Sequence, residues 1–133
     1  MKIIKTQFEG LKIIKNPKIY DNRGYFREIL AEKLIRKRLK FNYTSLSKKN
    51  VIRGLHLQNK RRQAKLVTVL SGKIFDVALD LRKKSKTFGK YFSIFLSEKD
   101  DTSLFIPEGF AHCFMSLSNN TLLLYQCSNY RHK

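Results

Sequence analysis

The sequence predicts one all-β domain over residues 1–133, a jelly-roll sandwich or barrel with one short helix near the N-terminus. A chain of 133 residues has the length of a single domain. Hydrophobic residues make up 42% of it, which is enough for a packed core. From Val51 onward, short strand-like stretches follow one another, and polar turns separate them at regular intervals.

The N-terminal part is less regular. The short strands expected there are Lys2–Phe8, Leu11–Ile14 and Tyr25–Ile29. Beyond them, the apolar residues change from alternation to helical spacing. One short helix is therefore expected, with an apolar face made of Leu30, Leu34, Ile35 and Leu39.

The rest of the chain is nearly all strand. The expected strands are Leu66–Leu70, Lys73–Leu81, Tyr91–Leu96, Ser103–Ile106, Cys113–Leu117 and Thr121–Cys127. The second of these alternates cleanly and places Asp76 and Asp80 on the same face as Ile74 and Ala78. Two acidic side chains on one face of a strand indicate that this face borders either solvent or a polar cavity.

Composition narrows the functional classes. The net charge of +18 points to an anionic partner, although the scattered basic residues favour a solubilising surface for most of it. No apolar run is long enough to cross a membrane, and the N-terminus does not resemble a secretion signal. Cys113 and Cys127 form no CxxC pair and are expected to be reduced thiols of a cytoplasmic protein.

Two distant segments carry the residues suited to chemistry. Val51–Leu70 contains His56, and Phe105–Phe114 contains His112. We expect the two segments to meet inside the barrel and to form a site for a negatively charged sugar nucleotide. Two histidines alone make a poor site for a first-row metal, so no metal is expected.

His56 is the candidate general base, because an imidazole titrates near neutrality. Arg53 and Lys65 lie close in sequence, and nearby cations lower the pKa of an imidazole and keep it neutral. Strict alternation places Arg53 and His56 on opposite faces, whereas Gly54 permits a bulge that unites them. The sequence leaves both arrangements open.

A series of motifs occurs in one order along nearly the whole chain: DNRGYFRE (21–28), RGLHLQ (53–58), KLV (65–67), DVALDLR (76–82), TFG (87–89), IPEGFAH (106–112) and LLLYQCSNY (122–130). In this combination the chain resembles the dTDP-4-dehydrorhamnose 3,5-epimerases and their sugar-nucleotide epimerase relatives. The resemblance implies a jelly-roll cupin that forms a homodimer and works without metal or other cofactor. The implied substrate is a dTDP-linked 4-keto-6-deoxyhexose, epimerised at C3, at C5 or at both in deoxysugar biosynthesis of the dTDP-rhamnose type.

The resemblance also implies roles for single residues. His56 matches the base that removes the α-proton, Tyr125 the tyrosine that returns a proton on the opposite face, and Lys65 the lysine that stabilises the enolate. The implied substrate-binding residues are Arg23, Phe26, Glu28, Arg53, Gln58 and His112. Of these, Arg53 is placed at the diphosphate and His112 in the sugar pocket. The first three belong to an N-terminal segment that, in the family, reaches the nucleotide from the partner subunit.

Some positions depart from the family pattern. The family continues past residue 133, and that portion holds the aspartate that pairs with the catalytic histidine, which makes Asp76 or Asp80 a candidate substitute. The glutamine and asparagine that usually precede the RGLH motif are replaced around Phe41–Tyr43. Arg131 stands where a tyrosine is common.

Other functions stay open from the sequence alone. One is a sugar-nucleotide 3,4-ketoisomerase, and another is a cupin whose catalysis is impaired. A third is a basic nucleic-acid-binding module, which draws on the charge and on the 10 phenylalanines and 6 tyrosines. Because the basic residues form no stripe interleaved with exposed aromatics, no nucleic-acid partner is expected.

Overall fold

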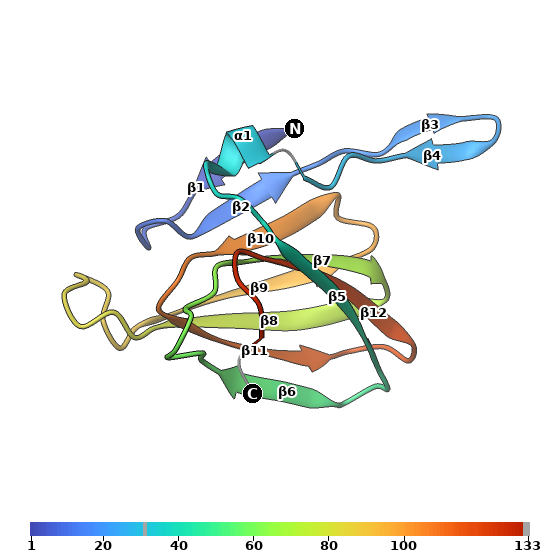
Figure 1. Cartoon of the computed structure of the whole chain (residues 1–133). Coiled ribbons are helices and arrows are strands. Elements are labelled where there is room, and N and C mark those ends of the chain that lie inside the picture. The colour runs from blue at the N-terminus through green and yellow to red at the C-terminus, as the bar shows by residue number, and fades with distance from the viewer. Residues whose placement is uncertain (31, 132–133) are drawn as a thin grey trace.

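The computed structural model describes residues 1–30 and 32–131 and consists of two antiparallel sheets packed face to face (Figure 1). The larger sheet has the order β1 (Lys2–Lys5), β2 (Lys12–Lys15), β10 (Thr102–Ile106), β7 (Lys65–Ser71), β12 (Thr121–Cys127) and β5 (Phe41–Ser47). The smaller sheet has the order β6 (Ile52–His56), β11 (Phe110–Ser116), β8 (Lys73–Asp80) and β9 (Tyr91–Ser97). This arrangement confirms the predicted jelly-roll class.

Alternation decides which residues fill the space between the sheets. On β8 the buried face is the one that carries the two acids, while the opposite face is only half-buried or exposed. The apolar core contains, among others, Phe8, Leu11, Val67, Val69, Ile74, Leu96, Leu104, Ile106, Phe110, Phe114 and Leu123. Each such side chain contributes about 1.5–3 kcal/mol through its burial.

A second apolar cluster covers the outer face of the larger sheet beneath the only helix among the described residues, α1 (Glu32–Ile35). The helix is shorter than the apolar pattern predicts, because Arg36 adopts a φ of 53° and ends it. Leu30 and Leu39 lie outside the helix, in segments without regular secondary structure, and still pack against this cluster. Their apolar spacing therefore reflects burial and not a longer helix. Ala31, within the expected helical stretch, lies outside the described residues. No helix that the structure describes is long and apolar enough to span a membrane.

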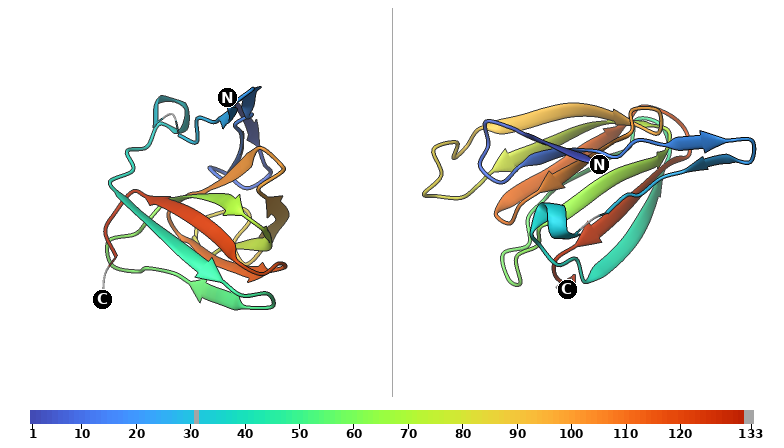
Figure 2. Two further views of the ribbon diagram at one scale, coloured as in Figure 1. Left: turned by 90° about the vertical axis from the view of Figure 1, so that its right-hand side faces the viewer. Right: turned by 90° about the horizontal axis from the view of Figure 1, so that it is seen from above.

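A two-stranded hairpin, β3 (Ile19–Asp21) with β4 (Gly24–Phe26), extends away from both sheets (Figure 1, Figure 2). It replaces the single longer strand expected at Tyr25–Ile29. Arg27 anchors its base, because its guanidinium donates to the backbone oxygen and to Oδ1 of Asn16 at 3.0 and 2.8 Å. The base of the hairpin is therefore fixed, while its tip is exposed to solvent.

Candidate functional site

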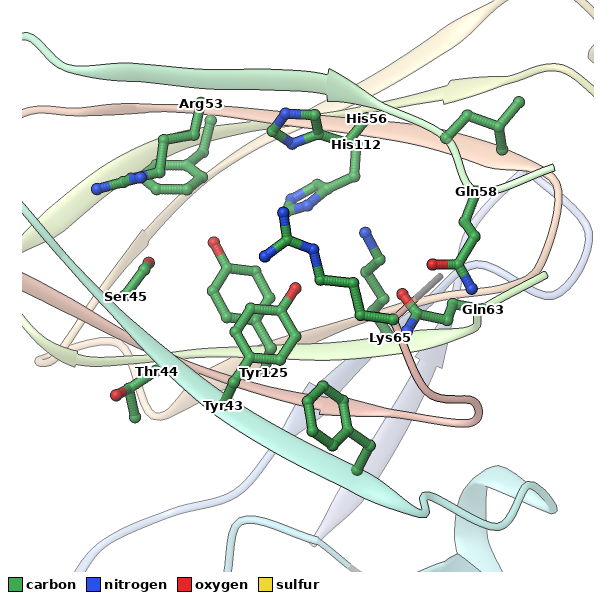
Figure 3. A pocket seen from close by; sticks show the side chains of 14 residues that line it. Tyr43, Thr44, Ser45, Arg53, His56, Gln58, Gln63, Lys65, His112 and Tyr125 are labelled. Atoms are coloured by element: carbon green, nitrogen blue, oxygen red, sulfur yellow. The ribbon is translucent and has the colours of Figure 1, made fainter. Parts of the chain in front are cut away.

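A cavity of about 570 Å³ opens between the two sheets, a size typical of small-molecule sites (Figure 3). Its lining comprises Phe41, Tyr43, Thr44, Ser45, Arg53, His56, Leu57, Gln58, Gln63, Lys65, His112, Phe114, Tyr125 and Arg131. The three residues predicted to be catalytic are among them, as are Arg53, Gln58 and His112. The sequence prediction that the two histidine segments meet inside the barrel is confirmed.

A bulge in β6 aims two predicted residues into the same cavity. Arg53 pairs with Phe114 and His56 with His112, so three steps along β6 oppose two along β11. Gly54 lies in the bulge with a φ of 130°, and a Cβ there would be 2.6 Å from the backbone oxygen of His112. Only glycine fits this close approach, and the bulged arrangement is the correct one of the two that the sequence allowed.

Arg53 is held along the cavity wall by its own neighbourhood. Its Nε donates to the hydroxyl of Ser47 at 2.9 Å, and a terminal nitrogen donates to the backbone oxygen of Leu46 at 3.1 Å. These bonds restrict a long side chain before any ligand arrives. A guanidinium fixed in this way is suited to a phosphate group.

His56 lies on the edge strand of the smaller sheet and is exposed to the cavity. Partial burial lowers the pKa of its imidazole, and the charge of Lys65 lowers it further, followed by His112, Arg131 and Arg53. The ring is therefore neutral near pH 7 and able to accept a proton. The predicted electrostatic effect of Arg53 and Lys65 on His56 is confirmed.

His112 occupies a different environment one strand inward. It is 4% exposed, and its Nε2 lies 2.8 Å from Oδ2 of Asp76, which is completely buried. The prediction that Asp76 orients His56 is therefore wrong, because its carboxylate bonds to the other histidine. Among residues 1–30 and 32–131, no group of three or more His, Cys, Asp or Glu side chains is arranged to hold a metal ion.

Asp80 also does not orient His56. Its carboxylate accepts hydrogen bonds from the guanidinium of Arg82 and from the hydroxyls of Ser85 and Thr87, all between 2.6 and 3.0 Å. These bonds outweigh burial and hold the pKa of the Asp80 carboxyl far below its usual range. Asp80 fixes the loop between β8 and β9, and its predicted link to His56 is wrong.

Lys65 and Tyr125 enter the cavity from neighbouring strands of the larger sheet, β7 and β12. Burial lowers the pKa of Lys65, although Cys127 and Asp76 partly counteract it. Tyr125 is 4% exposed, and burial raises the pKa of its phenol. Near pH 7 the cavity thus combines a neutral imidazole and a protonated phenol with the amino group of Lys65.

Two glutamines shape the mouth of the cavity. The Gln58 amide donates to the backbone oxygens of Arg61 and Tyr130 at 2.6 and 3.0 Å, and Gln63 donates to that of Asn129 at 2.6 Å. They tie the segment after β12 to the loop between β6 and β7. Arg131, which follows directly, lines the cavity as a result.

Several lining residues were not predicted as site residues. Phe41, Tyr43 and Arg131 stood out in the sequence only as departures from a family pattern, and Thr44, Ser45 and Gln63 did not stand out at all. The alternation of β5 was the available signal, because it places Phe41, Tyr43 and Ser45 on one face. Nothing in the sequence showed that this face borders the cavity.

The predicted N-terminal binding residues do not reach this cavity within one chain. Arg23 and Phe26 lie on the β3–β4 hairpin, and Arg23 pairs with Asp21 at 2.6 Å. Glu28 follows the hairpin and is likewise absent from the cavity lining. Phe26 is 64% exposed and Tyr20 is 70% exposed, so the hairpin presents aromatic side chains to solvent.

The sequence also matches known proteins. The sequence profile of the dTDP-4-dehydrorhamnose 3,5-epimerase family matches residues 5–133. The chain is 42% identical to the dTDP-4-dehydrorhamnose 3,5-epimerase of Methanothermobacter thermautotrophicus, covering 98% of this chain and 74% of the relative. It is 44% identical to that of Salmonella typhimurium, covering 98% of this chain and 75% of the relative.

A solved structure is also similar. It is a dTDP-6-deoxy-D-glucose-3,5-epimerase from Legionella pneumophila in complex with dTDP-4-keto-L-rhamnose. The TM-score is 0.94 at 42% identity, and the match covers 98% of this chain and 73% of that one. The predicted fold is therefore that of experimentally determined relatives.

Proposed function

This chain belongs to the dTDP-4-dehydrorhamnose 3,5-epimerase family, and from that premise we propose that it epimerises a dTDP-linked 4-keto-6-deoxyhexose at C3, at C5 or at both. One observation carries the proposal. His56 extends from the smaller sheet and Tyr125 from the larger sheet into the same cavity, which also contains Lys65. A base and an acid on different walls are what inversion of a carbon centre requires.

The proposed reaction is a proton removal followed by a proton return. The His56 imidazole takes the proton from the carbon next to the ketone, and the C–H electron pair forms a double bond to C4. The C4 oxygen becomes an oxyanion, which the Lys65 ammonium stabilises. The Tyr125 hydroxyl then gives its proton to the opposite face of the same carbon, and the ketone re-forms. Exchange of protons with solvent restores neutral His56 and protonated Tyr125.

The protonation states support this direction of transfer. The lowered pKa of His56 keeps the base unprotonated near pH 7, and the raised pKa of Tyr125 keeps the acid protonated. Each group therefore starts the reaction in the form it needs, without a preceding proton transfer between them.

Arg53 binds the diphosphate in this proposal. Its guanidinium is anchored to Ser47 and Leu46 at the cavity wall. The excess of 28 basic over 10 acidic residues also favours the approach of an anionic nucleotide. His112 is the predicted contact in the sugar pocket, and Gln58 is a further predicted substrate-binding residue.

The proposed assembly is a homodimer in the cytoplasm, in which the β3–β4 hairpin of one subunit reaches the nucleotide bound by its partner. Arg23 and Phe26 support it, because they are predicted binding residues that do not line their own cavity. Light scattering on the purified protein is expected to give twice the chain mass. A monomer at assay concentration contradicts the proposal.

Proton exchange tests the catalytic proposal directly. The protein is incubated with a dTDP-4-keto-6-deoxyhexose in heavy water, and deuterium at C3 and C5 is followed by NMR. We expect deuterium at one or both carbons and a product with inverted configuration. Absence of exchange contradicts epimerisation, and migration of the ketone to C3 identifies a ketoisomerase instead.

A further inference from the structure

Tyr43 lies against the proposed acid, Tyr125, in the cavity wall. The two rings are stacked with centroids 4.6 Å apart and planes 12° apart (Figure 3). They come from neighbouring strands, and Tyr43 on β5 is paired directly with Tyr125 on β12. Directly opposed aromatic pairs of this kind stabilise a sheet and fix the orientation of both rings.

Tyr43 in turn packs against further aromatic rings. Phe41 packs against it with centroids 5.7 Å apart, and Tyr130 packs against Phe41 at the same separation. Tyr43 is 36% exposed, so its ring forms part of the cavity surface and also backs Tyr125. Aromatic contacts therefore run without interruption from Tyr130 to Tyr125.

Tyr125 also contacts a second ring. His112 meets its ring edge-on, with centroids 6.2 Å apart, and Asp76 holds His112 in place. Tyr125 is thus confined by two rings, one stacked on it and one held in place by a hydrogen bond. A ring held in this way has little freedom to turn its hydroxyl away from a bound sugar.

We propose that Tyr43 is a positioning residue, whose ring keeps the Tyr125 hydroxyl aimed at the carbon that receives the proton. The inference rests on the proposed epimerase function and deepens it. Proton transfer depends steeply on geometry, and a displacement of about 1 Å can cost roughly a hundredfold in rate. The ring of Tyr43, not its hydroxyl, performs this role, because the stacked face is what contacts Tyr125.

Two substitutions separate the ring from the hydroxyl. Tyr43→Phe keeps the stacking surface, so kcat for epimerisation is expected to stay within about twofold of the wild type. Tyr43→Leu removes the stacked ring, and kcat is expected to fall about ten- to a hundredfold while KM changes little. Phe88→Leu, on the exposed loop between β8 and β9, is the control for loss of an aromatic side chain outside the cavity.

The outcomes that overturn the inference are distinct. Equal losses in Tyr43→Phe and Tyr43→Leu assign the effect to the hydroxyl. An unchanged kcat in Tyr43→Leu removes the role altogether, and a change in KM alone makes Tyr43 a substrate contact. Thermal unfolding of each variant identifies any loss of activity that comes from unfolding.

A second measurement does not depend on activity. NMR of the protein with fluorinated tyrosine reports the mobility of the Tyr125 side chain. Greater mobility of the whole Tyr125 side chain is expected in Tyr43→Leu and not in Tyr43→Phe, and identical dynamics in both variants overturn the inference. If the wild type shows no proton exchange, the proposed function fails, while this measurement still decides whether Tyr43 positions Tyr125.

Discussion

The two histidines of the cavity are paired across neighbouring strands but have opposite surroundings. His56 lies on the edge strand β6, exposed to the cavity and surrounded by cations that lower its pKa. His112 lies on the inner strand β11, 4% exposed and bonded to the buried carboxylate of Asp76. The first can exchange a proton with a substrate, whereas the second has its Nε2 already engaged.

The difference shows how one site obtains both reactivity and rigidity from the same residue type. A proposed base needs an accessible ring with a pKa at or below neutrality, and an edge strand offers access. A supporting ring needs a fixed orientation, and burial beside a carboxylate provides it. The environment, and not the residue type, separates the proposed base from its neighbour.

The largest effect is expected from removing the base. His56→Ala should lower the rate of deuterium exchange about 10²–10⁴-fold, because general-base catalysis contributes that much. NMR in heavy water measures it. Since the ring is exposed, the free energy of unfolding should change by less than about 0.5 kcal/mol. Exchange at the wild-type rate removes His56 from the mechanism.

Asp76→Asn tests the supporting histidine. The amide cannot offer His112 the same charged acceptor, so exchange should slow about ten- to a hundredfold. The free energy of unfolding should also fall by about 1–3 kcal/mol, because a buried hydrogen bond is weakened. Exchange kinetics and urea unfolding give the two values. If stability falls and exchange does not, the His112–Asp76 pair serves the fold alone.

Asp80→Asn is the matched change on the same strand, four residues along β8. It should lower the free energy of unfolding by about 1–3 kcal/mol and leave exchange unchanged, because Asp80 contacts the loop and not the cavity. The pKa of Asp80 is lower in the folded state, so its stabilisation is complete above its unfolded pKa of about 3.9. The difference in stability between wild type and variant should therefore shrink as pH falls below about 4, which urea unfolding across pH checks. Slower deuterium exchange in Asp80→Asn would show that Asp80 affects the catalytic site.

The smallest effect is expected from a cation at the cavity mouth. Arg131 lowers the pKa of His56 less than partial burial and Lys65 do. Arg131→Gln removes that charge, which makes protonation of His56 easier and raises its pKa. The acidic limb of the kcat/KM profile should move slightly to higher pH. A shift in the opposite direction would show that the limb belongs to another group.

Most strands after Val51 were predictable, because alternation and turn residues mark them locally. The helix was predicted to be too long, because Leu30 and Leu39 pack against the same apolar cluster although they lie outside it. The β3 strand was missed because its residues are exposed and carry no buried face.

The sequence predicts which residue types line the cavity, but it does not predict which side chains form hydrogen bonds with one another. Alternation indicates which face a residue occupies, but it does not give the register between strands distant in sequence. In the structure, β8 and β11 align so that Phe114 faces Asp76 and His112 faces Ala78, which sets His112 diagonally beside Asp76. That register, and not any local pattern, decides which histidine receives the carboxylate.

The position of β12 has a consequence for how the protein is made. This strand follows all the other described strands in the sequence, yet it lies inside the larger sheet between β7 and β5. Until it inserts, both neighbours present unpaired edges, and the cavity lacks the phenol of Tyr125. A chain synthesised only as far as β11 therefore lacks both the strand that joins β7 to β5 and the proposed acid of the cavity.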